Sequence, residues 1–500
     1  MPECKFQLTR VCQFVQRNNF FAMKHSFLLL LSFFQCCPSF SQTPALNFQL
    51  KSEFVVPFPA TPQAIVPDTE KKPYFYLAAK AGGLLVYNIE NESLPVLVKT
   101  IPIAQLNNLE VMNATQRGHL LYLSLGNFFG EVNLQAPGIA IIDVSEPNNP
   151  IVLDVWDSGV VVQGSGSVTV DGDFAYLCAM KKGLIILNIS NPDSIKYVSE
   201  ITPDKNFPLP NPDGVHEPRA RGVAIRDNIA FLCYDAGGLR VINITDKNHP
   251  IETGRYINST PFVPTEKQQA FNNILLDGNK AYIATDYCGM EILDISDTAH
   301  ISSLGWWNPW QCQSITNLWI GSPGHTNQLA FDTTLQLVFL ASGQSELSVV
   351  DVSNPIAPSL AGNYGTIDNG IGTWGMALDG NRVYLVYIAT FIPFASNWAG
   401  VKILDWQLGS GIYESDIFFK GNLVPNPFGE NFRFEFELRK PALIMAELLD
   451  SQGRIVAEWP EKTFQEGTNM FYWHGQIPNG LYFFRIRSKG ASYRARLLKY

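Results

Sequence analysis

The polar residues best suited to bind a ligand lie in short segments that precede apolar, strand-like runs. Arg219 and Arg221 stand two positions apart in HEPRARGVA, and alternate side chains of an extended chain share a face. Two guanidinium groups could therefore converge on one anion. Equivalent segments carry further polar and aromatic residues, namely Asn272, Asn273, His325, Asn327 and Trp374. We predict that these side chains line one polar mouth able to hold an anion, a sugar or a peptide; the alternative is that they only bond neighbouring strands or water.

No recognised catalytic or metal-binding pattern accompanies these residues. The sequence lacks G-x-S-x-G, H-E-x-x-H, a phosphate-binding loop and paired C-x-x-C motifs. His216 and Glu217 have no further His or Cys at a ligand spacing, so we interpret them as part of an exposed loop. We expect no enzyme activity, no metal and no cofactor. The rival hypothesis is an extracellular hydrolase or lyase, which would need several carboxylates or a histidine cluster at one mouth.

The segment from Ile301 to His325 is the most unusual insertion in the chain. It carries four tryptophans, Trp306, Trp307, Trp310 and Trp319. Exposed tryptophans stack on sugars or anchor protein interfaces, but a long aromatic loop can equally fold back on its own sheet, and both interpretations stay open. Cys288 and Cys312 could pair across this segment in an oxidising compartment, which the sequence alone does not decide. Cys178 and Cys233 are expected to be small buried thiols.

The elements that would position these residues come from an internal repeat. Seven segments share a pattern in which Asn or Asp follows the first position by five residues, with Ile, Leu and Val between them. The segments begin at Gly83, Gly138, Gly183, Gly238, Gly289, Glu346 and Gly400. The copy at Glu346 departs from the others because it lacks the glycine. A period of roughly 50 residues is typical of propeller blades.

Each unit is predicted to be a four-stranded antiparallel meander, with Asp-Gly turns such as Asp171-Gly172 between its first two strands. The third strand is apolar on both faces, so the sheets must stack on one another, and radial stacking leaves only short edges. We predict an all-β, seven-bladed β-propeller over residues 45–410, with an open solenoid as the rival. The segment Phe48–Pro57 would supply the outer strand of the last blade, and the competing candidate is GIYESDIFF, residues 411–419.

Three runs carry a family resemblance: IIDVSEPNNP, IILNISNPDS and VVDVSNPIAP. They resemble the LVIVD repeat of secreted and surface-associated bacterial β-propellers, and the resemblance covers residues 45–410. It implies the fold, but this repeat family has no shared catalytic residues to carry over.

From Asn422 the chain changes to alternating apolar and polar residues bounded by turn signals, which predicts a small immunoglobulin-like β-sandwich over 422–500 after a linker of residues 411–421. PNPF, ELLDSQGRIV, NGLYFFRI and a basic closing segment resemble the type A sorting domain of the type IX secretion system. The matching residues are Pro425, Asn426, Pro427, Gly453, Gly480 and Tyr482. The resemblance implies recognition by the outer-membrane translocon, followed by release or surface attachment.

Residues 1–41 are predicted to be a secretory signal peptide, with Met23 as an alternative start: Met23-Lys24-His25 leads into SFLLLLSFFQCC and then PSFSQ. Its apolar run is too short for a membrane span. The net charge of −9 is spread along the chain without a basic patch, so no nucleic-acid partner is expected. We therefore expect a protein that is secreted or displayed on the outer membrane, without a span in the mature chain, and that binds an extracellular protein or glycan.

Overall fold

The structure is a computed structural model that describes residues 46–129, 133–208, 217–262, 269–317, 322–390, 393–408, 418–438, 441–450, 454–488 and 491–500. Its regular structure is almost entirely β-strand, and the helices among these residues are short 3-10 turns: η1 (Ile103–Gln105), η2 (Asp286–Cys288) and η3 (Ile367–Asn369). The predicted all-β class is confirmed. Within this part of the chain, the structure holds no helix long and apolar enough to cross a membrane.

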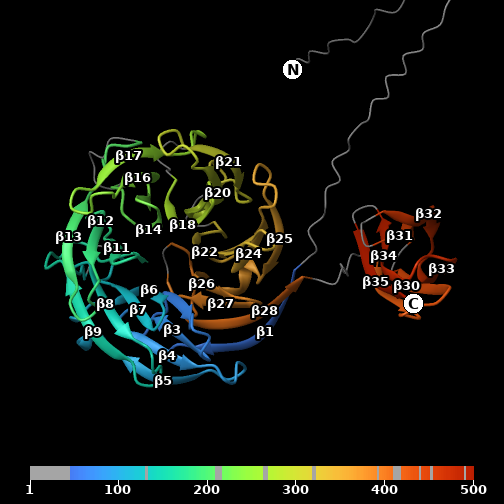
Figure 1. The fold of residues 1–500 in the computed structure, drawn as a ribbon, viewed down its shortest axis with the longest axis horizontal. Coiled ribbons are helices and arrows are strands. Elements are labelled where there is room, and N and C mark those ends of the chain that lie inside the picture. The colour runs from blue at the N-terminus through green and yellow to red at the C-terminus, as the bar shows by residue number, and fades with distance from the viewer. Residues whose placement is uncertain are drawn as a thin grey trace, which may run out of the picture. The chain divides into compact units, whose positions relative to one another are not determined.

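Residues 46–408 form seven four-stranded antiparallel sheets that follow one another around a common axis, as the blades of a β-propeller do (Figure 1). The first sheet contains β2 (Ala64–Pro67), β3 (Tyr74–Ala78), β4 (Leu84–Asn88) and β5 (Val96–Ile101). The second contains β6 (Val111–Arg117), β7 (Leu120–Leu125), β8 (Gly138–Asp143) and β9 (Ile151–Asp157). The third contains β10 (Val168–Asp171), β11 (Phe174–Cys178), β12 (Leu184–Asn188) and β13 (Lys196–Ile201).

The next three sheets repeat this order. The fourth contains β14 (Gly222–Arg226), β15 (Ile229–Cys233), β16 (Leu239–Asn243) and β17 (Ile251–Tyr256). The fifth contains β18 (Phe271–Asp277), β19 (Lys280–Thr285), β20 (Gly289–Asp294) and β21 (Ser302–Trp307). The sixth contains β22 (Thr326–Asp332), β23 (Leu337–Ser342), β24 (Leu347–Asp351) and β25 (Ser359–Tyr364). The first strands β6, β14, β18 and β22 lie on the inner side of their sheets, nearest the axis (Figure 1).

The seventh sheet joins the two ends of the ring. Its order is β1-β28-β27-β26, so that β26 (Thr373–Asp379), β27 (Arg382–Tyr387) and β28 (Gly400–Leu408) come from the end of the ring and β1 (Leu46–Val55) from its start. The pairing of β1 with β28 runs from Leu46 opposite Leu408 to Val55 opposite Gly400. Of the two segments that the sequence left open, Phe48–Pro57 is the one that contributes to this outer strand. The competing segment lies mostly outside the described residues, and its last residues begin β29, which pairs with β30.

The repeated Asn or Asp of the motif makes a turn in which its side chain accepts a backbone hydrogen bond two residues later. Asn188 Oδ1 accepts from the Ser190 amide at 3.0 Å, and Asp143 Oδ1 accepts from the Ser145 amide at 2.7 Å. The seventh copy differs because Asp405 lies inside β28. Its carboxylate instead contacts Lys51 of β1, with 2.6 Å between Oδ2 and Nζ, and Arg382 of β27.

The repeated glycine solves a steric problem at the start of the third strand. Gly183 has a φ of +82°, and a Cβ there would lie 2.2 Å from the carbonyl oxygen of Ile201 in the fourth strand. Gly238 and Gly289 have similar φ values of +73° and +75°. The third strand itself is buried on both faces: Leu184, Ile185, Ile186 and Leu187 of β12 are fully inaccessible. Each fully buried aliphatic side chain of this size contributes roughly 1.5–3 kcal/mol.

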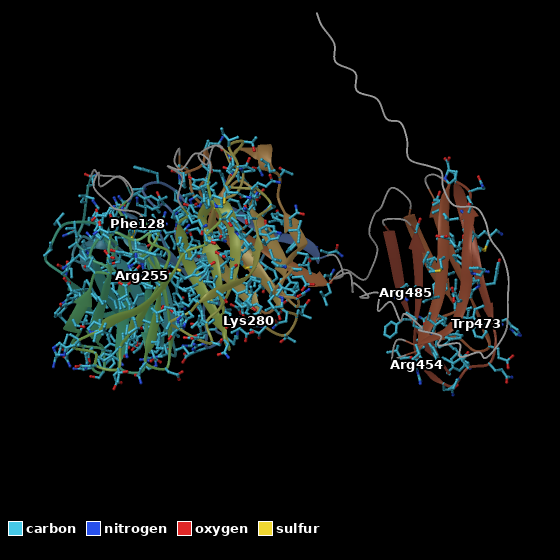
Figure 2. All side chains as sticks on the ribbon, turned by 90° about the horizontal axis from the view of Figure 1, so that it is seen from above. Phe128, Arg255, Lys280, Arg454, Trp473 and Arg485 are labelled. Carbon is cyan, nitrogen blue, oxygen red and sulfur yellow. A yellow bond between two sulfur atoms is a disulfide. The ribbon has the colours of Figure 1, made fainter. Side chains whose placement is uncertain are left out.

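The C-terminal region forms two further sheets around their own core. One sheet contains β29 (Phe418–Val424), β30 (Asn431–Leu438) and β33 (Gly467–His474). The other contains β32 (Ile455–Phe464), β31 (Ala442–Asp450), β34 (Gly480–Ser488) and β35 (Ala491–Lys499). Phe432, Phe434, Phe436, Leu448 and Phe484 meet between them. This core shares no residue with those of the ring, where buried side chains of neighbouring sheets pack together. Figure 2 draws the side chains of both regions.

Candidate functional site

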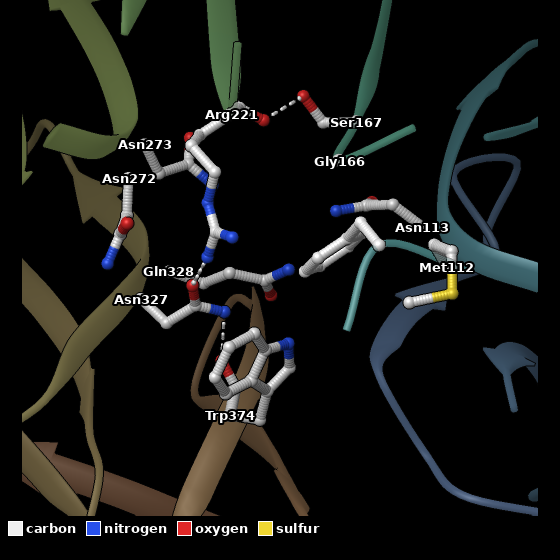
Figure 3. A pocket seen from close by; sticks show the side chains of 11 residues that line it. Met112, Asn113, Gly166, Ser167, Arg221, Asn272, Asn273, Asn327, Gln328 and Trp374 are labelled. Carbon is white, nitrogen blue, oxygen red and sulfur yellow. Dashed lines mark hydrogen bonds between the residues drawn. The ribbon is translucent and has the colours of Figure 1, made fainter. Parts of the chain in front are cut away.

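A small polar pocket lies at one end of the central channel, where the first strands of several sheets begin (Figure 3). Its cavity volume is about 20 Å³, room for about one water molecule, and it opens to solvent. Phe128 marks this face of the ring and Lys280 the opposite face (Figure 2). The pocket is lined by Met112, Asn113, Phe128, Gly166, Ser167, Arg221, Asn272, Asn273, Asn327, Gln328 and Trp374. Five residues singled out from the sequence, Arg221, Asn272, Asn273, Asn327 and Trp374, are therefore brought together here.

Arg221 is the cation of this pocket. Its backbone is fixed, because the amide donates to Cys233 O at 2.9 Å and the carbonyl accepts from Ser167 Oγ at 2.8 Å. The half-buried guanidinium lies over the ring of Phe128, with 4.9 Å from Cζ to the centroid, and Nη2 is 3.5 Å from Asn327 Oδ1. A guanidinium carries five N–H donors in one plane, so it can bind an acceptor in the pocket without leaving the aromatic face.

Two of the pocket amides join neighbouring sheets. Asn272 Nδ2 donates to Thr326 O at 2.9 Å, and Asn327 Nδ2 donates to Trp374 O at 2.8 Å. These bonds correspond to the alternative considered from the sequence, in which the polar residues hold adjacent blades together. Asn113 differs, because its Oδ1 bonds the next residue's amide at 2.7 Å and its amide nitrogen points into the pocket (Figure 3).

Arg219 does not line the pocket, but both arginines act on the same internal carboxylate. Burial raises the pKa of Asp235 above its ordinary value, while the positive charges of Arg221 and Arg219 oppose that rise and Asp286 adds to it. Asp235 follows β15 and pairs through its backbone with Phe271 at the start of β18. An anion that attracts both guanidinium groups is therefore already part of the fold.

His325 lies beside the pocket in an aromatic layer. Its side chain is only 3% exposed, and Nε2 is 2.7 Å from Asp286 Oδ1. The imidazole stacks on Trp374 with ring centroids 5.4 Å apart, and the edges of Tyr287 and Phe394 meet it at 5.2 and 5.5 Å. The structure thus places His325 in a packed environment rather than at an open mouth.

The aromatic layer crosses the end of the channel and was not anticipated from the sequence. Phe128 and Phe129 stack at 4.6 Å, and Phe129 is 5.1 Å from Trp374. Phe394 and Met180 belong to the same buried cluster. Phe128 and Phe394 lie in the connections after β7 and β27, which are longer than the corresponding turns elsewhere in the repeat. The length of these two connections and their aromatic residues are the sequence features that could have predicted the aromatic layer.

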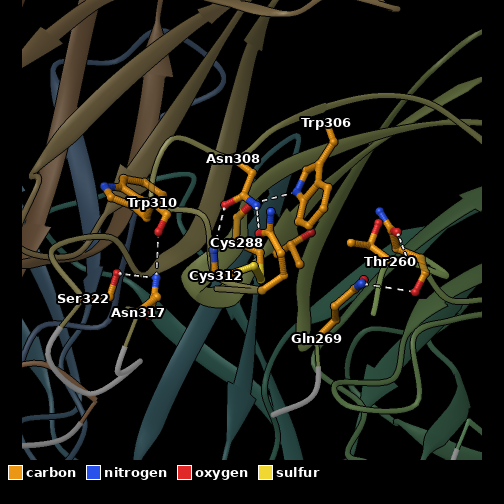
Figure 4. The surroundings of a disulfide bond; sticks show 12 residues. Thr260, Gln269, Cys288, Trp306, Asn308, Trp310, Cys312, Asn317 and Ser322 are labelled. Atoms are coloured by element: carbon orange, nitrogen blue, oxygen red, sulfur yellow. Dashed lines mark hydrogen bonds between the residues drawn. A yellow bond between two sulfur atoms is a disulfide. The ribbon is translucent and has the colours of Figure 1, made fainter. Parts of the chain in front are cut away.

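The tryptophans described in the 301–325 segment fold back on their own sheet (Figure 4). Trp306 Nε1 donates to Cys288 O at 2.8 Å. Trp307 is buried, and its ring meets that of Trp310 edge-on at 5.5 Å. Asn317 Nδ2 donates to Trp310 O at 3.0 Å. These contacts favour the packing interpretation over a sugar-binding surface for these three residues; Trp319 lies outside the described residues.

The cysteines resolve into one disulfide and two buried thiols. Cys288 and Cys312 are bonded to each other, which answers the question that the sequence left open (Figure 4). Cys178 and Cys233 are free and buried, as predicted. Burial raises the pKa of the Cys178 thiol to about 12, against the smaller opposing effects of Ser167 and Arg221. That thiol therefore stays protonated and unreactive at neutral pH.

Glu217 forms ion pairs rather than part of a metal site. It contacts Lys205 and lies 3.4 Å from Lys181 Nζ. Burial opposes its charge, but the two lysines hold the pKa of Glu217 below its ordinary value. His216 lies outside the described residues. Within the described part of the chain, the structure holds no cluster of three or more His, Cys, Asp or Glu residues able to hold a metal ion.

The residues that carry the resemblance to a sorting domain lie at two places in the C-terminal region. Pro425, Asn426 and Pro427 are exposed after β29, and Asn426 Oδ1 accepts from the Leu498 amide at 3.0 Å. Tyr482 is buried and its hydroxyl donates to Pro478 O at 2.7 Å. Gly480 begins β34. Gly453 lies outside the described residues.

Comparison with known families identifies the repeat. The LVIVD repeat model matches residues 164–202, 219–258, 271–306 and 337–366. These matches lie in the third to sixth sheets, so the chain contains LVIVD repeats. No curated protein matches the chain.

One solved structure supports the same fold. The crystal structure of RRP9 WD40 repeats is similar with a TM-score of 0.50 and 11% identity, covering 73% of this chain and 99% of that chain. YCF48 from Cyanidioschyzon merolae gives a TM-score of 0.47 at 10% identity, covering 72% and 98%. The computationally designed Ika8 protein gives 0.42 at 11% identity, covering 71% and 99%. At these identities the first similarity supports the β-propeller fold and nothing about function.

The disulfide is expected to stabilise the ring. Replacing both Cys288 and Cys312 by Ala should lower the free energy of unfolding by about 3 kcal/mol, because the bond closes a loop in the unfolded chain. Urea denaturation with and without reductant measures this effect. Reductant should destabilise the wild-type protein and leave the double variant unchanged; equal stability of both proteins without reductant would contradict the assignment.

Proposed function

We propose that this chain is a non-catalytic binding module, secreted or displayed at the cell surface, that binds a protein or glycan at the Arg221 pocket. The observation that carries the proposal is the combination of one guanidinium, aromatic faces and side-chain amides at the end of the channel. Binding sites of propellers commonly lie where the loops of the blades converge.

The chemistry of the pocket favours an anionic or hydroxyl-rich group as ligand. A carboxylate matches the planar donors of Arg221, and sugar hydroxyls match amides such as Asn113. Phe128 and Trp374 supply apolar faces beside those donors, as sugar and peptide sites generally do. An acidic glycan or an exposed carboxylate of a protein fits this set of groups.

The proposal includes a finer architecture. Seven sheets with β1 in the last one support a seven-bladed propeller closed by its N-terminal strand. The two C-terminal sheets support an immunoglobulin-like sandwich. Its sequence motifs, together with the leader, support a route through signal-peptide export and then the type IX translocon, which would recognise residues 422–500.

An extracellular hydrolase or lyase is the second candidate, and the His325–Asp286 contact is the observation that favours it. A catalytic histidine must exchange a proton with substrate through a reachable ring nitrogen. Here Nε2 faces Asp286 and Nδ1 is also buried. For His325 to act on a substrate, one ring nitrogen would have to become reachable from the pocket, so the binding module stays the first proposal.

Removing the pocket cation should weaken binding. Arg221→Ala is expected to reduce the affinity for the ligand at least tenfold, because a hydrogen bond to a charged group contributes about 1.5–3 kcal/mol. A glycan array and a pull-down from surface extracts identify the ligand, and calorimetry on that ligand gives the affinities. Arg226→Ala is the matched control, since its guanidinium bonds Gly278 O at 2.7 Å within the scaffold. Equal affinities of Arg221→Ala and wild-type protein would contradict the assigned site.

Export should depend on the C-terminal region. A chain truncated from Asn422 onward is expected to accumulate in the periplasm, whereas the full-length chain reaches the medium or the outer surface. Cell fractionation and protease shaving of intact cells distinguish these locations. Protease resistance of the truncated propeller serves as the control for folding, and normal surface delivery of the truncated chain would overturn the sorting assignment.

A further inference from the structure

Glu346 stands where most copies of the repeat carry glycine, and its carboxylate is the centre of a buried network in the last two sheets. The residue is only 1% exposed. Oε2 accepts from Lys402 Nζ at 3.0 Å and from the Tyr387 hydroxyl at 2.5 Å. Oε1 accepts from Asn369 Nδ2 at 2.6 Å. One carboxylate therefore holds an amine and a carboxamide side by side.

The surroundings of the amine are aromatic. Lys402 lies on β28 with a side chain that is 9% exposed, and its Nζ is 4.9, 5.6 and 5.8 Å from the ring centroids of Tyr387, Tyr364 and Trp398. Gly365 leaves room for the carboxylate, because a Cβ there would lie 2.3 Å from Glu346 Oε1. Such an enclosure excludes water, which otherwise competes for the amine and the carboxyl group.

We propose that Lys402 and Asn369 form an intramolecular amide bond, with Glu346 as the proton-transfer group. The new bond joins Lys402 Nζ to Asn369 Cγ, and the bond from Cγ to Nδ2 breaks to release ammonia. No oxidant, reductant or cofactor is consumed.

The protons balance through Glu346. The ammonium of Lys402 first gives one proton to the carboxylate along the 3.0 Å hydrogen bond, which frees its electron pair to attack Cγ. A second proton of Nζ passes to Nδ2, which leaves as ammonia, and the amide retains the third. Glu346 ends the reaction protonated and returns its proton to solvent or to ammonia. Holding both reacting groups on one carboxylate supplies the proximity that an uncatalysed amine and amide lack.

The acceptor carbonyl is also activated. The backbone amide of Ile371 donates to Asn369 Oδ1 at 3.1 Å, on the atom where negative charge develops during attack. Burial, and then the charge of Glu346, raise the pKa of Tyr387, so its hydroxyl stays protonated and keeps donating to the carboxylate. Asn369 itself lies on an exposed turn, η3, which gives ammonia a path to solvent.

The bond would stabilise the seventh sheet, in which the two ends of the ring pair. It links the connection before β26 to β28, the strand that pairs with β1. Like a disulfide, it would restrict the unfolded chain, but reductant would not break it.

Mass spectrometry of the purified mature protein tests the proposal. After reduction of the Cys288–Cys312 disulfide, the intact mass should be lower than the sequence mass by about 17 Da, the mass of one ammonia. A digest should contain a branched peptide that joins the segments around residues 369 and 402. An unmodified mass, with the mature N-terminus read from the same digest, would overturn the proposal.

Variants distinguish this bond from other losses of ammonia. Asn369→Ala and Lys402→Arg should each restore the full mass for their sequences, and Lys402→Arg keeps the positive charge beside Glu346. A succinimide at Asn369-Gly370 loses the same mass but does not need Lys402, so a deficit that persists in Lys402→Arg would refute the amide bond.

Matched controls are Lys51→Arg on the neighbouring strand β1 and Asn363→Ala on β25, which should keep the deficit. Circular dichroism and gel-filtration elution confirm that each variant is folded. If both Asn369→Ala and Lys402→Arg have wild-type-like spectra and the full mass, the bond is missing because a reacting group was removed and not because the variant is unfolded.

Discussion

The antiparallel pairing of β1 with β28 brings the two ends of the ring into one sheet. Each sheet buries two faces, and each face needs a neighbour, so an open end would expose the apolar third and second strands of a terminal sheet. Asp405 stabilises the pairing of β1 with β28, because its carboxylate contacts Lys51 on β1 and Arg382 on β27. In other sheets the Asn or Asp at this motif position forms a turn. In the sheet that closes the ring, it forms ion pairs instead.

Local chemistry explains why the sequence predicted most of the ring. Three features arise from interactions within one sheet or between adjacent sheets: the Asn or Asp turn, the glycine with positive φ and the third strand that is apolar on both faces. They therefore recur in the copies that keep the motif residues. Position 346 was noted as a departure, but its partners were not predictable. Lys402 and Asn369 reach Glu346 only after the sixth and seventh sheets are folded against each other.

The pocket was predicted in part for a related reason. Arg221 and Asn273 precede or begin first strands, so the repeat alone places them near the axis. The burial of side chains around the pocket was harder to predict, since it depends on loops of unequal length. Phe128 and Phe394 belong to one buried aromatic cluster, and His325 packs against Phe394 instead of facing solvent. The tryptophans of the 301–325 segment illustrate the same limit, because a disulfide and hydrogen bonds to backbone draw them onto their own sheet.

Hydrogen exchange of the β1 amides tests most directly whether the ring is closed by this strand. If β1 is part of the seventh sheet, the amides of residues 46–55 that bond to β28 should exchange as slowly as those in β27 and β28, because they open only with the sheet. Exchange of β1 at the rate of an unstructured chain, while β27 and β28 remain protected, would contradict closure by β1.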